Sequence, residues 1–563
     1  MLALIAIVFL ELSTPSFLLQ YDIRPNRLYV EYLKYPKEVF STLWYGFRLQ
    51  LVLGIVFTAG LALLFRRLLQ VADEELQLWS VKLHSLVWPL AVFIVFAGIR
   101  STTQHRPANP ALFAITADAM VNSLVINSGY SVLYAIYSLK HEARSTEVYG
   151  KLADPVMIAH TRDWPWLKSY QYTNPDFPTL HWQQAPITRT KPLNIVIVLQ
   201  ESLGATFVQS LGGAPVTPNL EKLKTEGIWF NNLYATGTRS VRGIEAVLAG
   251  FMPTPAQSVV KLSNSQQGFT TLASILQQQG YQTQFVYGGE AHFDNMRSFF
   301  TGNGFADVVD LPRIKAPQFV GSWGASDEDL FNTAHQQLMQ MHAKGQPFFS
   351  LIFTSTNHEP FEFPDGRIVL HEEPKSTANN AVKYADWAMG QFFDQAKASD
   401  YWQDTVFLIV ADHDNRVYGS NLIPVEKFHI PGLILGGQVS PGVIEPLASQ
   451  VDLAPTLLSL AGVSACHSMD GRDFIADPVS PGRALIQFDN LFALMTEQEL
   501  TILRPNDTAL SAQYSKTTRQ LNLKEGVAPE AQQQKALAHV QLPSYLYRER
   551  KYSSAAKCKP AQW

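Results

Sequence analysis

The sequence has few cysteines, few charged residues and no internal repeat. Its 563 residues include two cysteines, Cys466 and Cys558, with no CxxC pair and no zinc-type spacing. This excludes a cysteine-based zinc module and a small scaffold held together by many disulfides. The two thiols either pair in an oxidising compartment or remain free and buried. A net charge of −4 gives no indication of a nucleic-acid-binding protein.

Charged residues make up 16% of the chain, against about a quarter in ordinary soluble domains, and apolar residues make up 47%. The first hundred residues hold most of the long apolar runs, so the deficit of charge is uneven. The chain is too long for one typical domain and has ample length for a large core.

About three transmembrane helices are expected within residues 1–105. Residues 44–64 are apolar apart from Arg48 and Gln50 and end at a basic flank, which is typical of a spanning helix. Residues 83–98 are a shorter candidate, with a buried helix as the alternative. Residues 1–19 contain Glu11 but lack a basic leader and a small-residue cleavage site, so they do not resemble a signal peptide. The apolar run starts directly after Met1, which leaves open a start further upstream.

The basic residues predict the orientation. Arg66, Arg67 and Lys82 lie in the expected loop between the second and third segments, which places that loop in the cytoplasm. The chain after Arg100 then lies on the outer side of the membrane. The loop 21–40 is also placed outside, although its basic residues are only partly offset by acidic ones.

Two regions flank the expected catalytic domain. Residues 106–191 are expected to hold amphipathic helices, lying on lipid or forming an ordinary hairpin, followed by a Trp- and Pro-rich surface linker. Residues 491–563 are polar and are expected to form a small C-terminal appendage with a loose tail.

Residues 192–490 alternate between strand-like and helix-like runs. The expected strands are 194–200, 228–234, 282–287, 347–354, 405–411, 430–435 and 484–488. The expected helices are 218–227, 241–250, 269–279, 326–343, 376–398 and 451–461. This alternation predicts an α/β sandwich with a mostly parallel central sheet.

Ionisable residues follow two of these strands. Glu201 ends the run 194–200, and Asp412 and His413 end the run 405–411. Ligands bind beyond the carboxyl ends of the strands in open α/β sheets, and carboxylate and imidazole groups are ligands of divalent metals. The three residues therefore predict a metal site, and the alternative is that they are polar residues closing strands.

The turn 235–246 follows a strand and opens a helix. Ser240 stands where an N-cap residue is expected, and capping is its ordinary role. Beside a metal, the same hydroxyl could attack phosphorus, with Arg239, Arg242 and the helix N-terminus stabilising phosphoryl oxygens. Thr238 is the rival nucleophile.

Further candidates lie in loops. His358 follows the strand 347–354 and is suited to proton transfer. Trp323 stands between glycines and is expected to form a pocket wall, while Arg416 and Asp414 are expected to support the metal residues. Structural roles are expected for Asp294, Asn295 and His429.

The chain resembles the lipoteichoic acid synthase and membrane phosphoglycerol transferase branch of the alkaline phosphatase and sulfatase superfamily. The matching segments are residues 199–202, 237–243, 287–296, 322–327, 356–361, 411–413 and 451–456. The resemblance covers most of the chain but not the last seventy residues.

The resemblance implies a single divalent ion, manganese or magnesium with zinc as a further option, held by Glu201, Ser240, Asp412 and His413. It implies a covalent phospho-intermediate on Ser240 or Thr238, and it places His358 at the phosphate or leaving oxygen and Trp323 at the lipid headgroup. Arg239, Arg242 and Arg416 complete the expected substrate-binding set.

The function expected from these features is a membrane-anchored transferase. It would move phosphoglycerol from an anionic phospholipid, phosphatidylglycerol, to a glycan or lipid hydroxyl on the outer side of a bacterial cytoplasmic membrane. Hydrolysis by a phosphatase, phosphodiesterase or sulfatase is the alternative. Sulfate-ester cleavage is disfavoured because no Pro stands two residues after Ser240. Phosphoethanolamine transfer fits less well. Phosphoethanolamine transferases related to this family carry several disulfides, which the two cysteines of this chain cannot provide. A membrane-tethered scaffold with an inactive enzyme fold is a further alternative. The intact set of metal-ligand residues in this chain argues against it.

Overall fold

The computed structural model describes residues 2–21, 24–25, 29–30, 44, 48–75, 81–100, 121, 124–139, 144–172, 174–417 and 421–558. The chain divides into two units, Met1–His141 and Glu142–Trp563. Each unit is described by itself.

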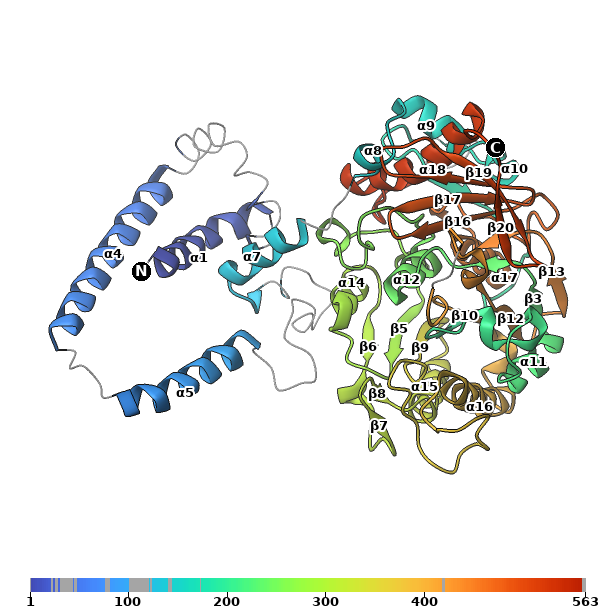
Figure 1. Ribbon diagram of the computed structural model, residues 1–563, viewed down its shortest axis with the longest axis horizontal. Coiled ribbons are helices and arrows are strands. Elements are labelled where there is room, and N and C mark those ends of the chain that lie inside the picture. The colour runs from blue at the N-terminus through green and yellow to red at the C-terminus, as the bar shows by residue number, and fades with distance from the viewer. Residues whose placement is uncertain are drawn as a thin grey trace. The chain divides into compact units, whose positions relative to one another are not determined.

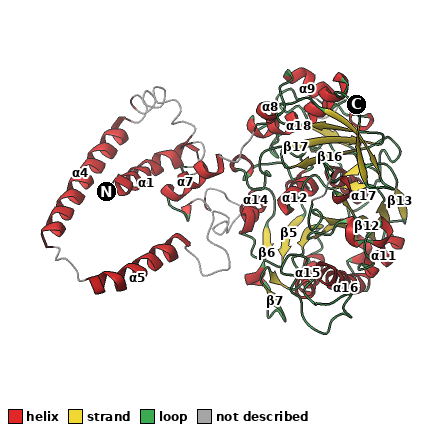
Figure 2. Ribbon diagram, viewed as in Figure 1, coloured by secondary structure: helices red, strands yellow, loops and turns green. Residues whose placement is uncertain are grey.

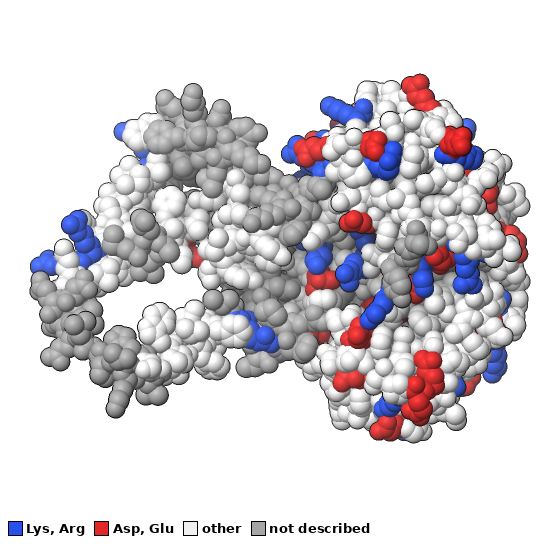
Figure 3. Space-filling view, in the orientation of Figure 1, with Lys and Arg blue, Asp and Glu red and all other residues white. Residues whose placement is uncertain are grey.

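The first unit contains apolar helices. Its main helices are α1 (Leu2–Tyr21), α4 (Arg48–Glu75), α5 (Val81–Arg100) and α7 (Ser128–Leu139). Among the described residues, one stretch is long and apolar enough to cross a bilayer: Arg48–Gln70 in α4, with a mean hydropathy of 2.0 and no burial. The apolar stretches of α1 and α5, at Ile5–Leu18 and Val87–Gly98, are shorter. The described surface of these helices carries few charged groups in Figure 3.

One sequence expectation for this unit changes. Arg66 and Arg67 lie within α4, so the basic flank is a continuation of the helix and not part of a loop. The segment at 111–115, expected to be amphipathic, lies outside the described residues.

A polar network accommodates Glu11 in the apolar helix α1. Its carboxylate accepts hydrogen bonds from Arg24 Nη1 at 3.0 Å and from the backbone N–H of Ser128 at 2.5 Å. The hydroxyls of Thr14 and Ser128 lie 2.5 Å apart. Pairing with Arg24 offsets the cost of holding a carboxylate among apolar helices.

The second unit is built on an eight-stranded sheet in the order β13-β3-β12-β10-β2-β9-β5-β6 (Figure 1). Its strands are β2 (Asn194–Gln200), β3 (Ile228–Phe230), β5 (Gln282–Tyr287), β6 (Asp307–Val309), β9 (Phe348–Phe353), β10 (Thr405–Ala411), β12 (Gly432–Gly436) and β13 (Gly442–Ile444). The segment β10-β2-β9-β5-β6 is parallel throughout, and β12 pairs antiparallel with both β10 and β3. Every residue of β2, β9 and β10 is buried, which is why these strands read as unbroken apolar runs.

Helices cover both faces of this sheet, as Figure 2 shows. One layer contains α11 (Pro218–Leu223), α15 (Asp327–Ala343) and α16 (Ala378–Lys397), and the other contains α12 (Ser240–Ala249), α13 (Leu272–Gln278) and α17 (Leu453–Ala461). The predicted α/β sandwich with a mostly parallel sheet is therefore confirmed. The expected strand 228–234 is divided, however: β3 joins the central sheet, whereas β4 (Leu233–Tyr234) joins a small sheet with β11 (His429–Ile430) and β14 (Ala448–Ser449).

The C-terminal region is a second, antiparallel sheet and not a loose tail over the described residues. Its five strands follow chain order: β16 (Arg483–Phe488), β17 (Leu491–Thr496), β18 (Leu500–Leu503), β19 (Leu510–Ser515) and β20 (Gln520–Leu523). The run 484–488 therefore belongs to this sheet and not to the central one. Helix α18 (Glu530–Arg548) packs on β17 and β18, and Cys466 forms a disulfide with Cys558.

The segment expected to be a surface linker is partly buried. It forms α9 (Asp154–Thr161) and α10 (Pro165–Lys168). The side chains of Trp164 and Trp166 are buried and their rings stack at 5.1 Å. Because α9 packs against α18, this segment joins the C-terminal region to the core.

His539 of α18 makes the stability of this region depend on pH. Its Nε2 accepts a hydrogen bond from Trp164 Nε1 at 2.8 Å and its Nδ1 donates to the Lys535 carbonyl at 2.7 Å, so both ring nitrogens are satisfied in the neutral form. Burial lowers the pKa of His539 to about 3. Below pH 6.5 the unfolded chain binds a proton that the folded protein does not, so stability falls as the pH falls towards 3.

We expect His539→Gln, whose amide can make both contacts, to remove this dependence. Between pH 6.5 and pH 5, the free energy of unfolding should fall in the full-length wild type by about 1 kcal/mol per pH unit more than in the variant. Denaturant unfolding followed by tryptophan fluorescence measures the difference, and parallel pH profiles for the two proteins would contradict it.

Candidate metal centre and active site

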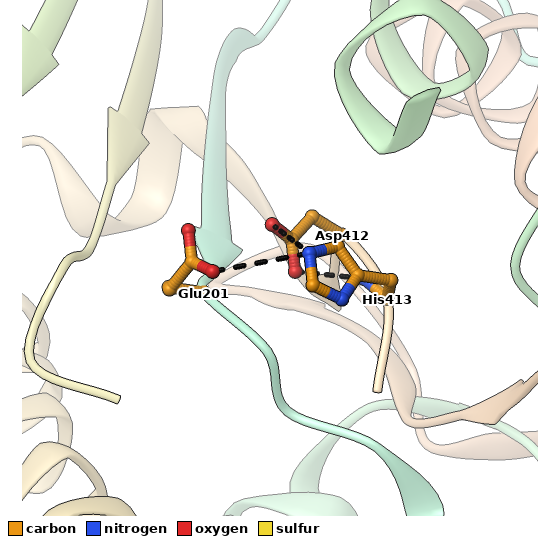
Figure 4. A group of neighbouring side chains, drawn as sticks. All are labelled: Glu201, Asp412 and His413. Carbon is orange, nitrogen blue, oxygen red and sulfur yellow. Dashed lines mark hydrogen bonds and ion pairs between the residues drawn. The ribbon is translucent and has the colours of Figure 1, made fainter. Parts of the chain in front are cut away.

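The register of the central strands brings the predicted metal residues together. Ala411 of β10 is paired with Gln200 of β2, so the residues that follow, Asp412 and Glu201, leave the sheet side by side. Glu201, Asp412 and His413 are buried, and one ligand atom of each lies within 4.8 Å of the others. Figure 4 shows the three side chains converging at this edge.

Asp412 is fully buried, and only one of its two carboxylate oxygens accepts hydrogen bonds from the protein. Its Oδ1 accepts hydrogen bonds from the backbone N–H groups of Ser202 and His413, both at 2.7 Å. Its Oδ2 is buried without a hydrogen-bond partner among the described residues. Burial and the neighbouring Glu201 carboxylate raise the pKa of Asp412 to about 7.

His413 is oriented to present Nε2 to the carboxylates. Its Nδ1 donates to the Asp414 carbonyl at 2.6 Å, which fixes the proton on Nδ1. Nε2 lies 3.5 Å from Asp412 Oδ2 and 3.9 Å from Glu201 Oε1. Burial alone would lower the pKa of His413, but the two carboxylates outweigh it and the pKa is raised. The Asp414 side chain is held by Thr206 and the backbone N–H of Asn415 and so supports this loop.

The arrangement fits a divalent cation. Two buried carboxylates and an imidazole whose unprotonated Nε2 faces them form a set of oxygen and nitrogen donors with excess negative charge. The unpartnered Asp412 Oδ2 is the kind of buried polar atom that protein structures otherwise avoid. A bound ion would satisfy this oxygen and remove the repulsion between the carboxylates.

Ser240 is the hydroxyl nearest to these groups. It is the first residue of α12, and Arg239, not Ser240, is the N-cap residue. Ser240 Oγ donates to Glu201 Oε2 at 3.1 Å and lies 3.4 Å from His413 Nε2. Its hydroxyl therefore faces the metal residues at a helix N-terminus, where it does not cap the helix.

A pocket with a volume of ≈ 390 Å³ opens in front of Ser240. The expected substrate residues Thr238, Arg239, Trp323, His358 and Arg416 all line it. So do further residues that the sequence did not single out, among them Tyr287, Phe293, Met296, Asn357, Glu359 and Asn415. Its size suits a small-molecule ligand.

One carbonyl orients both ring systems of the pocket wall. The Glu359 carbonyl accepts hydrogen bonds from Trp323 Nε1 at 2.7 Å and from His358 Nδ1 at 3.1 Å. The rings of Trp323 and His358 lie 3.5 Å apart between centroids, and Phe293 meets Trp323 edge-on. With its proton on Nδ1, neutral His358 has Nε2 available as a base.

A family model described as Sulfatase matches residues 193–463. A crystal structure of a protein in the alkaline phosphatase superfamily from Vibrio parahaemolyticus is 45% identical, covers 73% of this chain and 100% of its own, and has a TM-score of 0.70. The chain belongs to the alkaline phosphatase superfamily.

Two further proteins are similar to this chain. Phosphoglycerol transferase I of Xanthomonas campestris pv. campestris (strain B100) is 27% identical over 335 residues, covering 55% of this chain and 46% of the relative. The chain thus spans just under half the length of that relative. The lipoteichoic acid synthase LtaP from Listeria monocytogenes shares the fold, with a TM-score of 0.56 over 69% of this chain and 97% of its own at 19% identity. The resemblance inferred from the sequence is confirmed at the level of the superfamily.

The structure does not support the expected role of Arg242. It was expected to bind substrate, but it lies outside the lining of the pocket. Its guanidinium pairs with the fully buried Glu245 at 2.6 Å and donates to the carbonyls of Thr254 and Ala256. Glu245 also accepts from the backbone N–H of Val259 at 2.8 Å. These bonds leave Arg242 a structural role, holding α12 to the following loop.

The three residues for which structural roles were expected, Asp294, Asn295 and His429, make contacts of that kind. Asp294 pairs with Lys261 at 2.8 Å, although it also lines the pocket. Asn295 donates to Gln266 at 2.6 Å. His429 stacks on Tyr234, and burial lowers its pKa to about 4.

Residues that sequence reasoning missed hold Glu201 in place. The Glu201 N–H donates to Thr354 Oγ1 at 2.9 Å, and its carbonyl accepts from Asn357 Nδ2 at 3.0 Å. Both partners follow β9, and their loop is held by Asp327, whose Oδ1 accepts from the backbone of Ser355 and Thr356. Burial raises the pKa of Asp327 to about 6. Asn357 and Asp327 both lie in segments that carry the family resemblance, but the sequence assigned neither of them a role.

Gly243 allows α12 to approach the metal residues. A Cβ at this position would lie 2.5 Å from the Asp412 carbonyl oxygen and 2.6 Å from its Cα. We expect Gly243→Ala to push the helix outward and move Ser240 away from Glu201. Catalytic rate should fall about 100-fold, as small misplacements of reacting groups do.

The matched control is Gly442→Ala, because a Cβ there meets no atom within 4 Å. It should retain full activity. Activity of Gly243→Ala equal to that of the control would show that the close approach of α12 to Asp412 is not needed.

Proposed function

We propose that this protein is a metal-dependent transferase that moves a phosphoglycerol group from phosphatidylglycerol to a hydroxyl acceptor through a covalent intermediate on Ser240. The observation that carries the proposal is the position of Ser240 Oγ, 3.1 Å from Glu201 and 3.4 Å from His413 at the base of the pocket. The relatives named phosphoglycerol transferase I support this choice of substrate class.

Glu201, Asp412 and His413 would hold the ion, with Ser240 beside them. The donor set suits manganese or magnesium, with zinc as a further option. When bound, the ion would favour the ionised serine oxygen and neutralise charge on the phosphoryl oxygens.

The chain's own groups account for two displacements at phosphorus. In the first, Ser240 Oγ bonds to phosphorus, its proton leaves along the hydrogen bond to Glu201 Oε2, and the bond from phosphorus to the diacylglycerol oxygen breaks. That oxygen takes a proton from Nε2 of His358, which enters this step protonated on both ring nitrogens and leaves it neutral. In the second, the acceptor hydroxyl gives its proton to His358 and bonds to phosphorus, and Ser240 recovers its proton as its bond to phosphorus breaks.

The pocket residues have matching roles in this scheme. Arg239 and the N-terminus of α12 would hold the non-bridging oxygens. Trp323 and Phe293 would pack against the glycerol. Arg416 would bind the phosphate or the acceptor. Thr238 lines the pocket without a hydrogen bond to the metal residues, which favours Ser240 as the nucleophile.

We further propose that the protein is anchored in a bacterial cytoplasmic membrane with its catalytic unit on the outer side. Helix α4 supports an anchor, and the apolar helices α1 and α5 support more than one span. The Cys466–Cys558 disulfide fits an oxidising compartment. A lipid donor then need not leave the bilayer.

The test is conversion of labelled phosphatidylglycerol by the full-length protein in vesicles. Diacylglycerol should be released only when a divalent metal and a hydroxyl acceptor are present, and the label should appear on the acceptor. Release of free glycerol phosphate at the same rate without an acceptor would identify a hydrolase, and no release with any metal would refute the proposal.

A further inference from the structure

An exposed ion pair lies at the edge of the pocket. Glu359 follows β9 and Arg416 follows β10, and Arg416 Nη2 lies 2.6 Å from Glu359 Oε2. Both side chains line the pocket and are more than half exposed, at 63% and 59%. An ion pair this exposed contributes little to stability, so the sequence can change it without unfolding the protein.

The charges facing the pocket are almost balanced. Its cationic lining residues are Arg239 and Arg416, and its anionic ones, apart from the metal residues, are Asp294 and Glu359. Glu359 neutralises Arg416, and Lys261 neutralises Asp294 at 2.8 Å. Within the described part of the chain, Arg239 is the lining cation without an ion-pair partner.

This balance leaves about one positive charge for a ligand. A divalent ion would be neutralised by Glu201 and Asp412, and His358 adds charge only when protonated. One surplus positive charge matches a phosphodiester, which carries one negative charge. A phosphate monoester carries close to two above pH 7, because its second pKa is about 6.

We propose that Glu359 is a specificity-determining residue that restricts this pocket to singly charged phosphodiesters and disfavours doubly charged phosphate monoesters. It does so by occupying Arg416 and by adding its own negative charge at the pocket edge. This inference rests on the proposed function, in which the donor, the Ser240-linked intermediate and the product are all phosphodiesters. Inorganic phosphate and free glycerol phosphate would otherwise compete for the site.

Electrostatics gives the proposal a quantitative signature. The interaction energy between a fixed charge and a ligand is proportional to the charge on the ligand. Replacing Glu359 with glutamine should therefore change the logarithm of the affinity twice as much for a dianion as for a monoanion. If binding of a diester becomes about threefold tighter, binding of a monoester should become about ninefold tighter.

The experiment is calorimetric titration of the full-length, manganese-loaded protein in detergent at pH 8 and low salt. The probes are glycerol phosphate as the monoester and glycerophosphoglycerol as the diester. Glu359→Gln should show the unequal gains, and both should shrink at high salt. Glu372→Gln is the matched control, because this glutamate lies outside the pocket and contacts Asn379. It should bind both probes as the wild type does.

Each outcome bears on a separate claim. Equal gains for the two probes, or no gain, would overturn the role of Glu359 while leaving the transferase proposal in place. Failure of the wild type to bind either probe would overturn both. If Glu359→Gln does not fold, Arg416→Gln provides the opposite test: weaker binding, with twice the logarithmic loss for the monoester. An equal loss for both probes would again refute the inference.

Discussion

Replacing Ser240 with alanine is expected to abolish phosphoglycerol transfer, with a loss of about 10⁴-fold or more in catalytic rate. The serine hydroxyl faces Glu201 and His413 at the base of the pocket, and its removal leaves no oxygen at that place to form the covalent intermediate. Labelled phosphatidylglycerol should yield diacylglycerol with the wild type only. Mass spectrometry of protein quenched during turnover should find a glycerophosphoryl group on the peptide that contains Ser240.

Two neighbouring variants sharpen this result. Ser240→Thr keeps a hydroxyl and should retain part of the activity. Thr238→Ala should lose less than about tenfold, because Thr238 lines the pocket without a hydrogen bond to the metal residues. An inactive Thr238→Ala beside an active Ser240→Ala would transfer the nucleophilic role to Thr238.

Replacing Asp412 with asparagine should have opposite effects on activity and on the stability of the metal-free protein. Asparagine can still accept the hydrogen bonds from Ser202 and His413 but removes the charge that faces Glu201. Metal-dependent activity should fall on the order of 10³-fold because an anionic ligand is lost.

The metal-free stability should increase, and the sign follows from the pKa of Asp412. Burial and Glu201 raise this pKa from 3.8 to about 7, so the folded state binds more protons than the unfolded chain between these values. Stability without metal therefore falls as the pH rises through this window. At pH 8 the variant should be more stable than the wild type by up to about 4 kcal/mol, the free-energy equivalent of this shift.

Thermal unfolding with and without manganese measures both effects. The metal should raise the unfolding temperature of the wild type and leave that of Asp412→Asn unchanged. Asp386→Asn is the control: this buried aspartate accepts bonds from Asn219 and Leu220, and burial raises its pKa to about 6. It should retain metal-dependent activity. Stabilisation of Asp412→Asn by manganese equal to that of the wild type would argue against a metal site at Asp412.

The candidate metal-binding residues could be predicted because they come directly after strands in the sequence. Glu201 and Asp412 each follow a fully buried parallel strand, and parallel strands end at the same edge of a sheet. The structure adds the register, Ala411 beside Gln200, that brings the two carboxylates together.

Arg242 shows where this reasoning fails. An arginine next to a candidate nucleophile looks like a phosphate ligand, but Glu245 lies one helical turn away and is buried. The spacing of three residues was visible in the sequence, whereas the burial of Glu245 was not. A buried carboxylate binds the nearest cation strongly, and this decided the orientation of Arg242.

The C-terminal sheet was missed for a different reason. Its strands are short and pair only with sequence neighbours, and several are partly exposed, such as β20. Short, mixed strands carry a weak periodic signal, and their identity as a sheet comes from pairing.

The sequence by itself determined the long buried elements of the catalytic unit but not the short edge strands β6 and β13 of its central sheet. It also determined the residues at the ends of the central strands and the superfamily to which the chain belongs. These are local properties, because apolar runs and the polar residues after them are contiguous in the chain. Only the tertiary structure decided which hydroxyl faces the metal residues, that Glu359 neutralises Arg416 and that Asp327 supports the loop holding Glu201. Each of these depends on distances between segments far apart in sequence, which are set by packing around the sheet.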